Sequence, residues 1–389
     1  MNSLNQKKLP KLAVIRGHQP RMTEMYFYSY FNNFDVRMIG DKNTGWIVEN
    51  QIPKNVKFIH SPLYPKWGYD PWTKFLSNYY VHRSFQYVKD LEKLVADCDV
   101  LNVSDLFYFY CWQTAEIAQK TGKKLVAIVW ENIPKHISTY LPPYSLAVKQ
   151  MLKTTDLFIA RSFGAKKYLL SIGANPQKIQ VIYKGIDLTM FKPRKVIKNQ
   201  HKTRILYVGQ LVKSKGILEL LEAFRILYSE FNNLELLLVG RSYGEPLEKI
   251  IQNYFDLPII LKSQIDYDKL PQVYQEADIY CQLSQDWKYL NIIPGGNDWF
   301  PYSVIEAMTS GLPIVATNCG GIPEQLGNQG NLIVPQNNVA AAYQALKKFI
   351  ISPQLRQKIG LINRQRAIKL FNIKSQAEKT EAAVLNLFK

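Results

Sequence analysis

The sequence has few cysteines and no long apolar run. Its four cysteines, Cys98, Cys111, Cys281 and Cys319, lie far apart and form no CxxC pair, which argues against a zinc site and a disulfide framework and fits a reducing compartment. The only apolar run near the start, Leu12–Ile15, is too short for the core of a signal peptide, and no later stretch approaches the roughly 20 apolar residues of a membrane span. These absences predict a cytoplasmic protein.

The sequence also has no internal repeat with a period of roughly 20 to 50 residues and no low-complexity tract. Its 389 residues exceed twice the roughly 150 residues of a typical domain. Hydrophobic residues make up 47% and charged residues 21%, the balance of a globular chain rather than a disordered one. Two domains with sizeable cores are therefore expected.

Positive charge is in excess, and it is unevenly distributed. The formal net charge is +18, and the first 200 residues hold 29 Lys and Arg against 14 Asp and Glu, a net of +15. This asymmetry predicts that the first half meets an anionic surface or ligand, either a membrane leaflet or nucleic acid. The alternative is a solvated lysine surface.

Short apolar runs alternate with amphipathic stretches along the whole chain, which indicates βαβ units in two doubly wound α/β domains. Residues 192–202, KPRKVIKNQHK, are basic and polar and predict a linker. The expected division is an N-terminal domain at 1–191, this linker, a C-terminal domain at 203–372, and a C-terminal helix at 373–389 that crosses back to the N-terminal domain. A helix is also expected at Thr73–Ala96.

The stretch DWFPYSVIEAMTSGLPIVATNCGGIPE, from Asp298 to Glu324, is the most informative. Pro301 favours the first turn of a helix that ends near Gly311. Backbone N–H groups at such a start form an anion pocket, and seven residues separate Asp298 from Glu306. Taken alone, this spacing is more typical of helix dipole stabilisation or of a solvated surface.

The stretch resembles the acid-x7-acid signature of family 4 of the retaining glycosyltransferases, whose fold is GT-B, two Rossmann-like domains that face each other across a cleft. Five further blocks match the family in order. They are VIYKGIDLTMFKP, ILYVGQLVKSKGILELLEAF, LELLLVG and LPQVYQEADIYCQLS, and NLIVPQNN follows near the end. The resemblance implies an enzyme that moves a sugar from a nucleotide-sugar to a hydroxyl acceptor with retention, using no metal and no cofactor besides the donor.

Roles carry over from the family to matching positions. Glu306 would accept hydrogen bonds from the ribose hydroxyls, Asp298 would face the transferred sugar, and Lys215 would stabilise the leaving diphosphate. The remaining donor-binding positions that the resemblance implies are Gly17, Gln210, Gly216, Ile265, Trp299, Phe300 and Pro301.

The sequence departs from the family at several of these positions. Gln210 stands where the family often has an arginine, and Lys213 is the candidate substitute. The first acid is Asp298 rather than glutamate. The inserted segment QDWKYLNIIPGGN precedes it and contains Asp286, which competes for the sugar-facing role.

Acceptor-side candidates lie after strands of the first domain. They are His18, Asp105 and Glu131, because the carboxyl ends of parallel strands line the ligand crevice in such folds. Aromatic residues are dense from Tyr64 to Tyr110 and predict either a core or a surface that stacks on sugars, lipid or single-stranded nucleic acid.

The sequence thus predicts a glycosyltransferase of polysaccharide or glycolipid synthesis. Its partners would be a nucleotide-sugar and a hydroxyl acceptor that is lipid-linked at the inner membrane face, and nucleic acid is the less favoured partner. The alternative is a degenerate, noncatalytic protein that senses a nucleotide-sugar or binds nucleic acid, which the neutral Gln210 and the altered acceptor loops favour.

Overall fold

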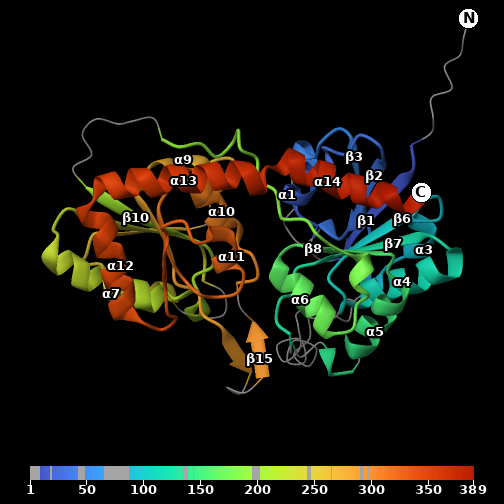
Figure 1. Cartoon of the computed structure of the whole chain (residues 1–389), viewed down its shortest axis with the longest axis horizontal. Coiled ribbons are helices and arrows are strands. Elements are labelled where there is room, and N and C mark those ends of the chain that lie inside the picture. Colours follow the sequence, from blue (N-terminus) through green and yellow to red (C-terminus); the bar gives the residue numbers. More distant parts are fainter. Residues whose placement is uncertain are drawn as a thin grey trace, which may run out of the picture. The chain divides into compact units, whose positions relative to one another are not determined.

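The computed structural model describes residues 9–17, 20–42, 49–64, 87–134, 136, 139–142, 144–194, 202–242, 247–263, 265–289, 293–296 and 298–389. The chain forms two compact units, Met1–Tyr183 with Lys374–Lys389, and Lys184–Ile373 (Figure 1). The first boundary lies before the linker expected at 192–202, most of which falls outside the described residues. The residues after Ile373 group with the first unit.

The first unit is built on a parallel sheet of seven strands in the order β3-β2-β1-β6-β7-β8-β9. Its strands are β1 (Lys11–Gly17), β2 (Asp35–Gly40), β3 (Val56–His60), β6 (Val100–Ser104), β7 (Lys124–Val129), β8 (Leu157–Ala160) and β9 (Ile179–Val181). Its helices are α1 (Met22–Tyr28), α3 (Leu91–Leu94), α4 (Phe109–Thr121), α5 (Tyr144–Thr154), α6 (Phe163–Ser171) and most of α14 (Ile373–Leu385). The central strands β6, β7 and β8 are almost entirely buried, which explains their nearly continuous apolar sequences.

The helix expected at Thr73–Ala96 is confirmed only in α3 (Leu91–Leu94) and is wrong over the rest of its described part. Residues 65–86 lie outside the described residues, and β5 (Tyr87–Val88) follows them and pairs antiparallel with β4 (Leu63–Tyr64). Only α3, near the end of the expected range, is helical. A strand pairing between distant segments outweighs the local helical pattern here.

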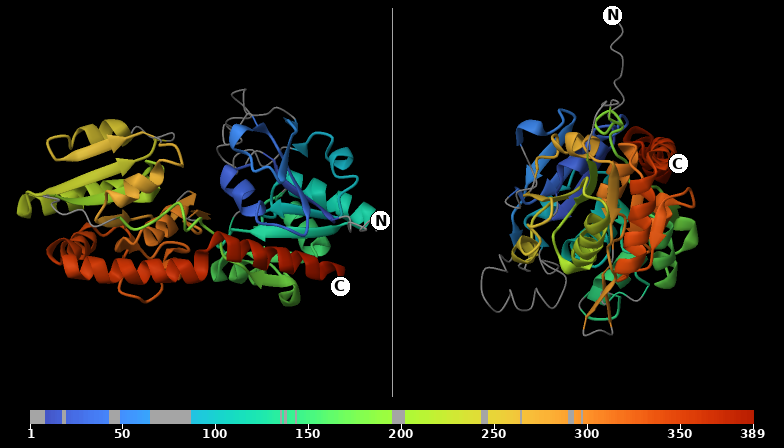
Figure 2. Two further views of the ribbon diagram at one scale, coloured as in Figure 1. Left: turned by 90° about the horizontal axis from the view of Figure 1, so that it is seen from above. Right: turned by 90° about the vertical axis from the view of Figure 1, so that its left-hand side faces the viewer.

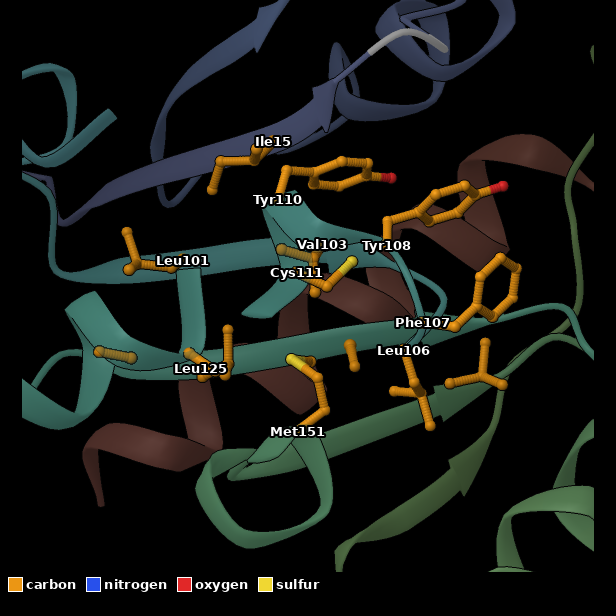
Figure 3. Packing of buried hydrophobic residues seen from close by; sticks show 14 of the residues in the cluster. Ile15, Leu101, Val103, Leu106, Phe107, Tyr108, Tyr110, Cys111, Leu125 and Met151 are labelled. Carbon is orange, nitrogen blue, oxygen red and sulfur yellow. The ribbon is translucent and has the colours of Figure 1, made fainter. Parts of the chain in front are cut away.

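The aromatic residues between the end of β6 and the start of α4 belong to the core of the first unit. Phe107, Tyr108 and Tyr110 are buried and belong to the same hydrophobic cluster as Leu101, Val103 and Leu106 (Figure 3). The rings of Tyr108 and Tyr110 are stacked with centroids 5.2 Å apart. These three side chains therefore pack the interior, as the core interpretation expected, and form no exposed stacking surface.

The second unit repeats the design with a parallel sheet in the order β12-β11-β10-β13-β16-β17. The strands are β10 (Thr203–Val208), β11 (Leu234–Val239), β12 (Ile259–Lys262), β13 (Ile279–Gln282), β16 (Ile314–Thr317) and β17 (Leu332–Val334). The helices are α7 (Ile217–Glu230), α8 (Leu247–Gln252), α9 (Leu270–Gln275), α10 (Tyr302–Thr309), α11 (Ile322–Leu326), α12 (Val339–Ile351) and α13 (Pro353–Phe371). Helix α12 packs on α7, and α13 packs on α10 along one side of the unit (Figure 2).

Numbered along this sheet, the strand order is 3-2-1-4-5-6, the doubly wound order. The order reverses between β10 and β13, which pair in parallel. Ligands of such folds bind outside the carboxyl ends of the strands at this reversal. The loops that follow β10 and β13 are therefore where a site is expected in the second unit.

The inserted segment between Ser284 and Asp298 forms a small antiparallel ribbon of β14 (Trp287–Tyr289) and β15 (Ile293–Gly296) (Figure 1). Among the described residues, no helix has the length and apolar character to cross a membrane. None of the four cysteines forms a disulfide, and all are buried.

Candidate active site

The loops after β10 and β13 bring Lys215 and Asp298 into an ion pair between the Lys215 ammonium and Asp298 Oδ1. Lys215 ends the short 3-10 turn Lys213–Lys215, and Asp298 follows the ribbon. Asp298 is 7% exposed, whereas the Lys215 side chain is 21% exposed. The lysine therefore lies on the solvent side of the pair, where its remaining N–H groups can meet a ligand.

The other Asp298 oxygen is held by polar side chains of β13 and its extension. Asp298 Oδ2 accepts hydrogen bonds from the Ser284 hydroxyl and, at 3.1 Å, from the Gln282 amide. Gln282 is held in turn by the Tyr280 hydroxyl, which donates to its Oε1 at 2.6 Å. Because buried polar groups that are fully hydrogen-bonded are rigid, this chain fixes the carboxylate.

Gly216 allows the turn that carries Lys215 to approach the loop after β13. Its φ is +68°, and a Cβ there would lie 2.0 Å from the carbonyl oxygen of Leu283. Only glycine fits both the left-handed conformation and the close approach. Gly216 thus shapes the site through the backbone, and Leu283 directly precedes the Ser284 that binds Asp298.

Glu306 is buried on α10, where the Tyr274 hydroxyl of α9 donates to its Oε2 at 2.7 Å. Burial raises the pKa of Glu306 to about 7, while the Tyr274 hydrogen bond and the charge of Lys184 act to lower it. A carboxylate with this pKa changes its charge near neutral pH, and its acceptor capacity changes with it.

Helix α10 begins at Tyr302, so Pro301 is its N-cap rather than a residue of its first turn, and the helix ends at Thr309. Pro301 gives no side-chain cap, and its carbonyl accepts from Gln325 at 2.9 Å. The first N–H groups of α10 therefore receive no capping side chain and suit an anion.

Burial differs among the other residues of the second unit that are predicted to bind the donor. Phe300 is buried, and its ring meets that of Phe371 edge to face at 5.8 Å, so its side chain packs the unit. Trp299, directly before it, is half-buried, Gln210 is exposed after β10, and Ile265 follows the edge strand β12.

Asp286 has side-chain partners other than Lys215, and one of them, the Cys319 sulfur, also accepts from the Asp298 N–H at 3.5 Å. Its Oδ2 accepts from the Gln336 amide at 3.0 Å, and its Oδ1 accepts from the Cys319 thiol at 3.4 Å. These contacts fix the base of the ribbon. Of the two competing acids, Asp298 is the one that lies against Lys215. Lys213 is exposed on the same turn as Lys215.

The first unit brings Asp105 and Glu131 together at the carboxyl ends of β6 and β7. Asp105 has a φ of +59° and accepts from the Trp130 N–H at 2.9 Å and the Glu131 N–H at 3.4 Å. Burial raises the pKa of Asp105 to about 6 and that of Glu131 to about 8. At neutral pH these values leave Asp105 mostly ionised and Glu131 mostly protonated.

Glu131 has a polar neighbour that the sequence interpretation missed. Glu131 Oε1 accepts from the N–H groups of Asn132 and Ile133 at 2.9 and 2.8 Å. Its Oε2 has no hydrogen-bond partner within the described part of the chain and lies 3.7 Å from His136 Nδ1. Burial lowers the pKa of His136 to about 4, so a neutral imidazole faces this oxygen at neutral pH.

Gly17, a further predicted residue of the first unit, ends β1. Gly17 has a φ of +51°, and a Cβ there would lie 2.7 Å from the Tyr110 ring, so packing alone accounts for glycine at this position. His18 lies outside the described residues.

Comparison with known families matches both halves of the chain. Residues 53–190 match the model described as Glycosyltransferase Family 4, and residues 190–366 match that described as Glycosyl transferases group 1. The chain is a family 4-like glycosyltransferase with the GT-B fold. The family and the fold expected from the sequence are confirmed.

Relatives share this assignment at modest identity. A mannosyltransferase of Mycolicibacterium hassiacum, named MMP alpha-(1->4)-mannosyltransferase, is 28% identical over 58% of this chain and 53% of its own. The putative colanic acid biosynthesis glycosyltransferase WcaL of Salmonella typhimurium is 28% identical over 60% of this chain and 57% of its own. The matched region thus spans about half the length of these curated relatives.

Solved structures agree over nearly the whole chain. HepE of Anabaena in complex with UDP has a TM-score of 0.72 at 16% identity and covers 97% of this chain and 100% of its own. Sucrose-phosphate synthase of Thermosynechococcus elongatus has a TM-score of 0.71 at 19% identity and covers 97% of this chain and 99% of its own. At such identities the likeness establishes the fold.

Proposed function

We propose that the protein transfers a glycosyl group from a nucleotide-sugar to a hydroxyl acceptor, with retention at the anomeric carbon, in polysaccharide or glycolipid synthesis. The observation that carries the proposal is the Lys215–Asp298 ion pair at the switch point between β10 and β13. A cation there meets the diphosphate, and a fixed carboxylate meets the hydroxyls of the transferred sugar.

In this mechanism Lys215 stabilises the negative charge that develops on the leaving diphosphate. A preorganised cation aimed at developing charge accelerates such a step without reorganisation. The first N–H groups of α10 add partial positive charge to the same ligand. Glu306, in its ionised form, accepts from the ribose hydroxyls. The proposal includes no metal ion and no cofactor besides the two substrates.

The acceptor hydroxyl belongs, in this proposal, to the edge of the first unit that carries Asp105 and Glu131. The buried Oε2 of Glu131 is the atom that supports it, because a hydroxyl bound there would satisfy a polar atom for which the described residues supply no hydrogen bond. His136, neutral at physiological pH, would accept or donate a proton beside it.

The test of the transfer reaction is release of free nucleotide from a panel of nucleotide-sugars with uridine, guanosine and adenosine diphosphate groups. UDP is the first probe because HepE of Anabaena was solved with UDP and with UDP-glucose. We expect release with one donor, lost in Lys215→Met and kept in Lys348→Met, an exposed lysine of α12. Binding without release in the presence of candidate acceptors would support the noncatalytic sensor instead.

We also propose that the basic first half adsorbs to anionic membranes, where a lipid-linked acceptor is presented at the inner face. The support is its net charge of +15, and adsorption should weaken as salt rises because surface attractions are screened over about 10 Å at 0.1 M. Sedimentation with anionic and neutral vesicles measures this. Equal and salt-insensitive recovery of the protein with both kinds of vesicle would contradict electrostatic adsorption. Tighter binding to single-stranded nucleic acid than to vesicles would favour nucleic acid as the partner.

A further inference from the structure

Lys184 is a buried cation at the start of α10. It is the first residue of the second unit and is 9% exposed. Its ammonium lies over the ring of Tyr302, the first residue of the helix. Its charge also lowers the pKa of Glu306, one turn further along α10. The side chain therefore lies among the groups that the proposed function assigns to the donor.

A lysine at this end of a helix adds positive charge where the helix dipole is already positive. The first turn of α10 contains no acidic residue, and Pro301 provides no cap. Burying an ammonium also costs solvation free energy. The cation and the helix dipole thus add positive potential at the start of α10, which the ionised Glu306 carboxylate offsets in part and a bound anion would offset further.

The other side chains of the proposed donor site leave room for a second positive charge besides that of Lys215. Lys215 is already bound to Asp298. Gln210, at the position where the family often has arginine, is neutral and exposed, and its carbonyl accepts from the Tyr207 hydroxyl at 2.7 Å. A diphosphate is strongly anionic and favours two cations over one.

We propose that Lys184 is the second cation of the donor site and binds the diphosphate of a nucleoside diphosphate, with the ring of Tyr302 holding its ammonium at the start of α10. This inference rests on the proposed donor site and adds a residue to it. In this proposal Lys184, the first residue of the second unit, supplies the positive charge that the neutral Gln210 does not.

The test compares ligands that do and do not contain the diphosphate. Titration calorimetry with UDP, GDP and ADP identifies the best nucleoside diphosphate for the unaltered protein, and competition gives the affinity of the matching nucleoside. Measurements at about pH 9 keep Glu306 ionised in every variant. In Lys184→Met we expect the diphosphate affinity to fall about tenfold or more, and the nucleoside affinity to change less than about twofold.

Two variants control for charge and for folding. Lys184→Arg keeps the charge and should retain diphosphate affinity within about threefold. Lys348→Met removes an equivalent charge from the exposed face of α12 and should change neither affinity. Thermal unfolding of each variant, with Lys184→Gln as a second neutral variant, separates loss of binding from loss of fold.

The outcomes distinguish the two proposals. An unaltered protein that binds none of the three nucleoside diphosphates overturns the proposed donor site itself. An unaltered protein that binds one, with Lys184→Met and Lys184→Gln equally tight, overturns only the role of Lys184. Equal losses for diphosphate and nucleoside would also overturn it, because they would indicate a structural effect on the pocket rather than a contact with phosphate.

Discussion

The hydroxyl of Tyr274 donates to Oε2 of Glu306 across 2.7 Å, from α9 to α10. This bond stabilises the ionised carboxylate against the effect of burial, which raises the pKa of Glu306 to about 7. The proton on Glu306 and a ribose hydroxyl would compete for the same oxygens. In the proposed donor site, donor recognition would thereby be linked to pH in the physiological range.

Nucleoside affinity should rise as pH increases through about 7, because the ionised Glu306 accepts from both ribose hydroxyls and the protonated form has one oxygen less to offer. Tyr274→Phe removes a bond that lowers the pKa, so the rise should move upward by about one pH unit or more. Glu306→Gln should abolish the pH dependence and weaken binding about 10- to 100-fold. Calorimetry from acidic to basic pH measures all three. An unshifted profile in Tyr274→Phe would show that this bond does not control the carboxylate.

Lys215→Met should lower turnover about 100-fold or more, because the cation acts as the diphosphate leaves. It should also lower the free energy of unfolding by about 1 to 3 kcal/mol, because it leaves the Asp298 carboxylate without its cation. Adding Asp298→Asn to Lys215→Met should recover stability but not turnover. Denaturant unfolding and nucleotide release measure the two effects, and recovery of turnover in the double variant would contradict a direct role for Lys215.

The two competing acids differ in their contacts, which predicts different losses. Asp298→Asn should lower turnover about tenfold or more, because a charge-assisted contact with the sugar becomes neutral. Asp286→Asn should be nearly silent, because Asp286 is bound to Gln336 and Cys319 at the base of the ribbon. Nucleotide release at saturating donor compares them. Loss of turnover in Asp286→Asn alone would place the ribbon's acid at the sugar.

Much of the sheet architecture could be predicted because buried parallel strands are nearly continuous apolar runs. The strand β8 (Leu157–Ala160) is such a run, and β16 (Ile314–Thr317) is one up to its last residue. The β4–β5 pair could not be predicted, because Leu63 and Val88 meet across a long segment and local patterns do not encode such pairings. The ribbon between Ser284 and Asp298 was expected only as an insertion.

The candidate site could likewise be predicted only in part. The acid-x7-acid motif predicts Asp298 and Glu306. It does not predict partners that lie far away in the sequence, such as Lys184 and Tyr274, which act on Glu306. One signal was available. Tyr280, Gln282 and Ser284 alternate along β13 and its extension, and residues two apart on a strand share a face. A polar face on an otherwise buried strand predicts a hydrogen-bond chain, which the structure contains.

The close approach at Gly216 predicts a large cost for one added methyl group. In Gly216→Ala the left-handed backbone costs about 1 to 2 kcal/mol, and the new Cβ, placed 2.0 Å from the Leu283 carbonyl oxygen, must displace main chain. A loss of about 3 kcal/mol or more in the free energy of unfolding is expected. Turnover should fall as well, because the displacement moves both loops that hold the Lys215–Asp298 pair.

Gly122 is the matched control for this prediction. It ends α4 with a φ of +71°, and no atom lies within 4 Å of its added Cβ. Gly122→Ala therefore meets the same backbone strain without the clash and should cost only about 1 to 2 kcal/mol, with turnover unchanged. Denaturant unfolding and nucleotide release of the two variants isolate the contact with Leu283. Equal losses of stability would mean that backbone strain alone, and not the approach of the two loops, requires glycine at position 216.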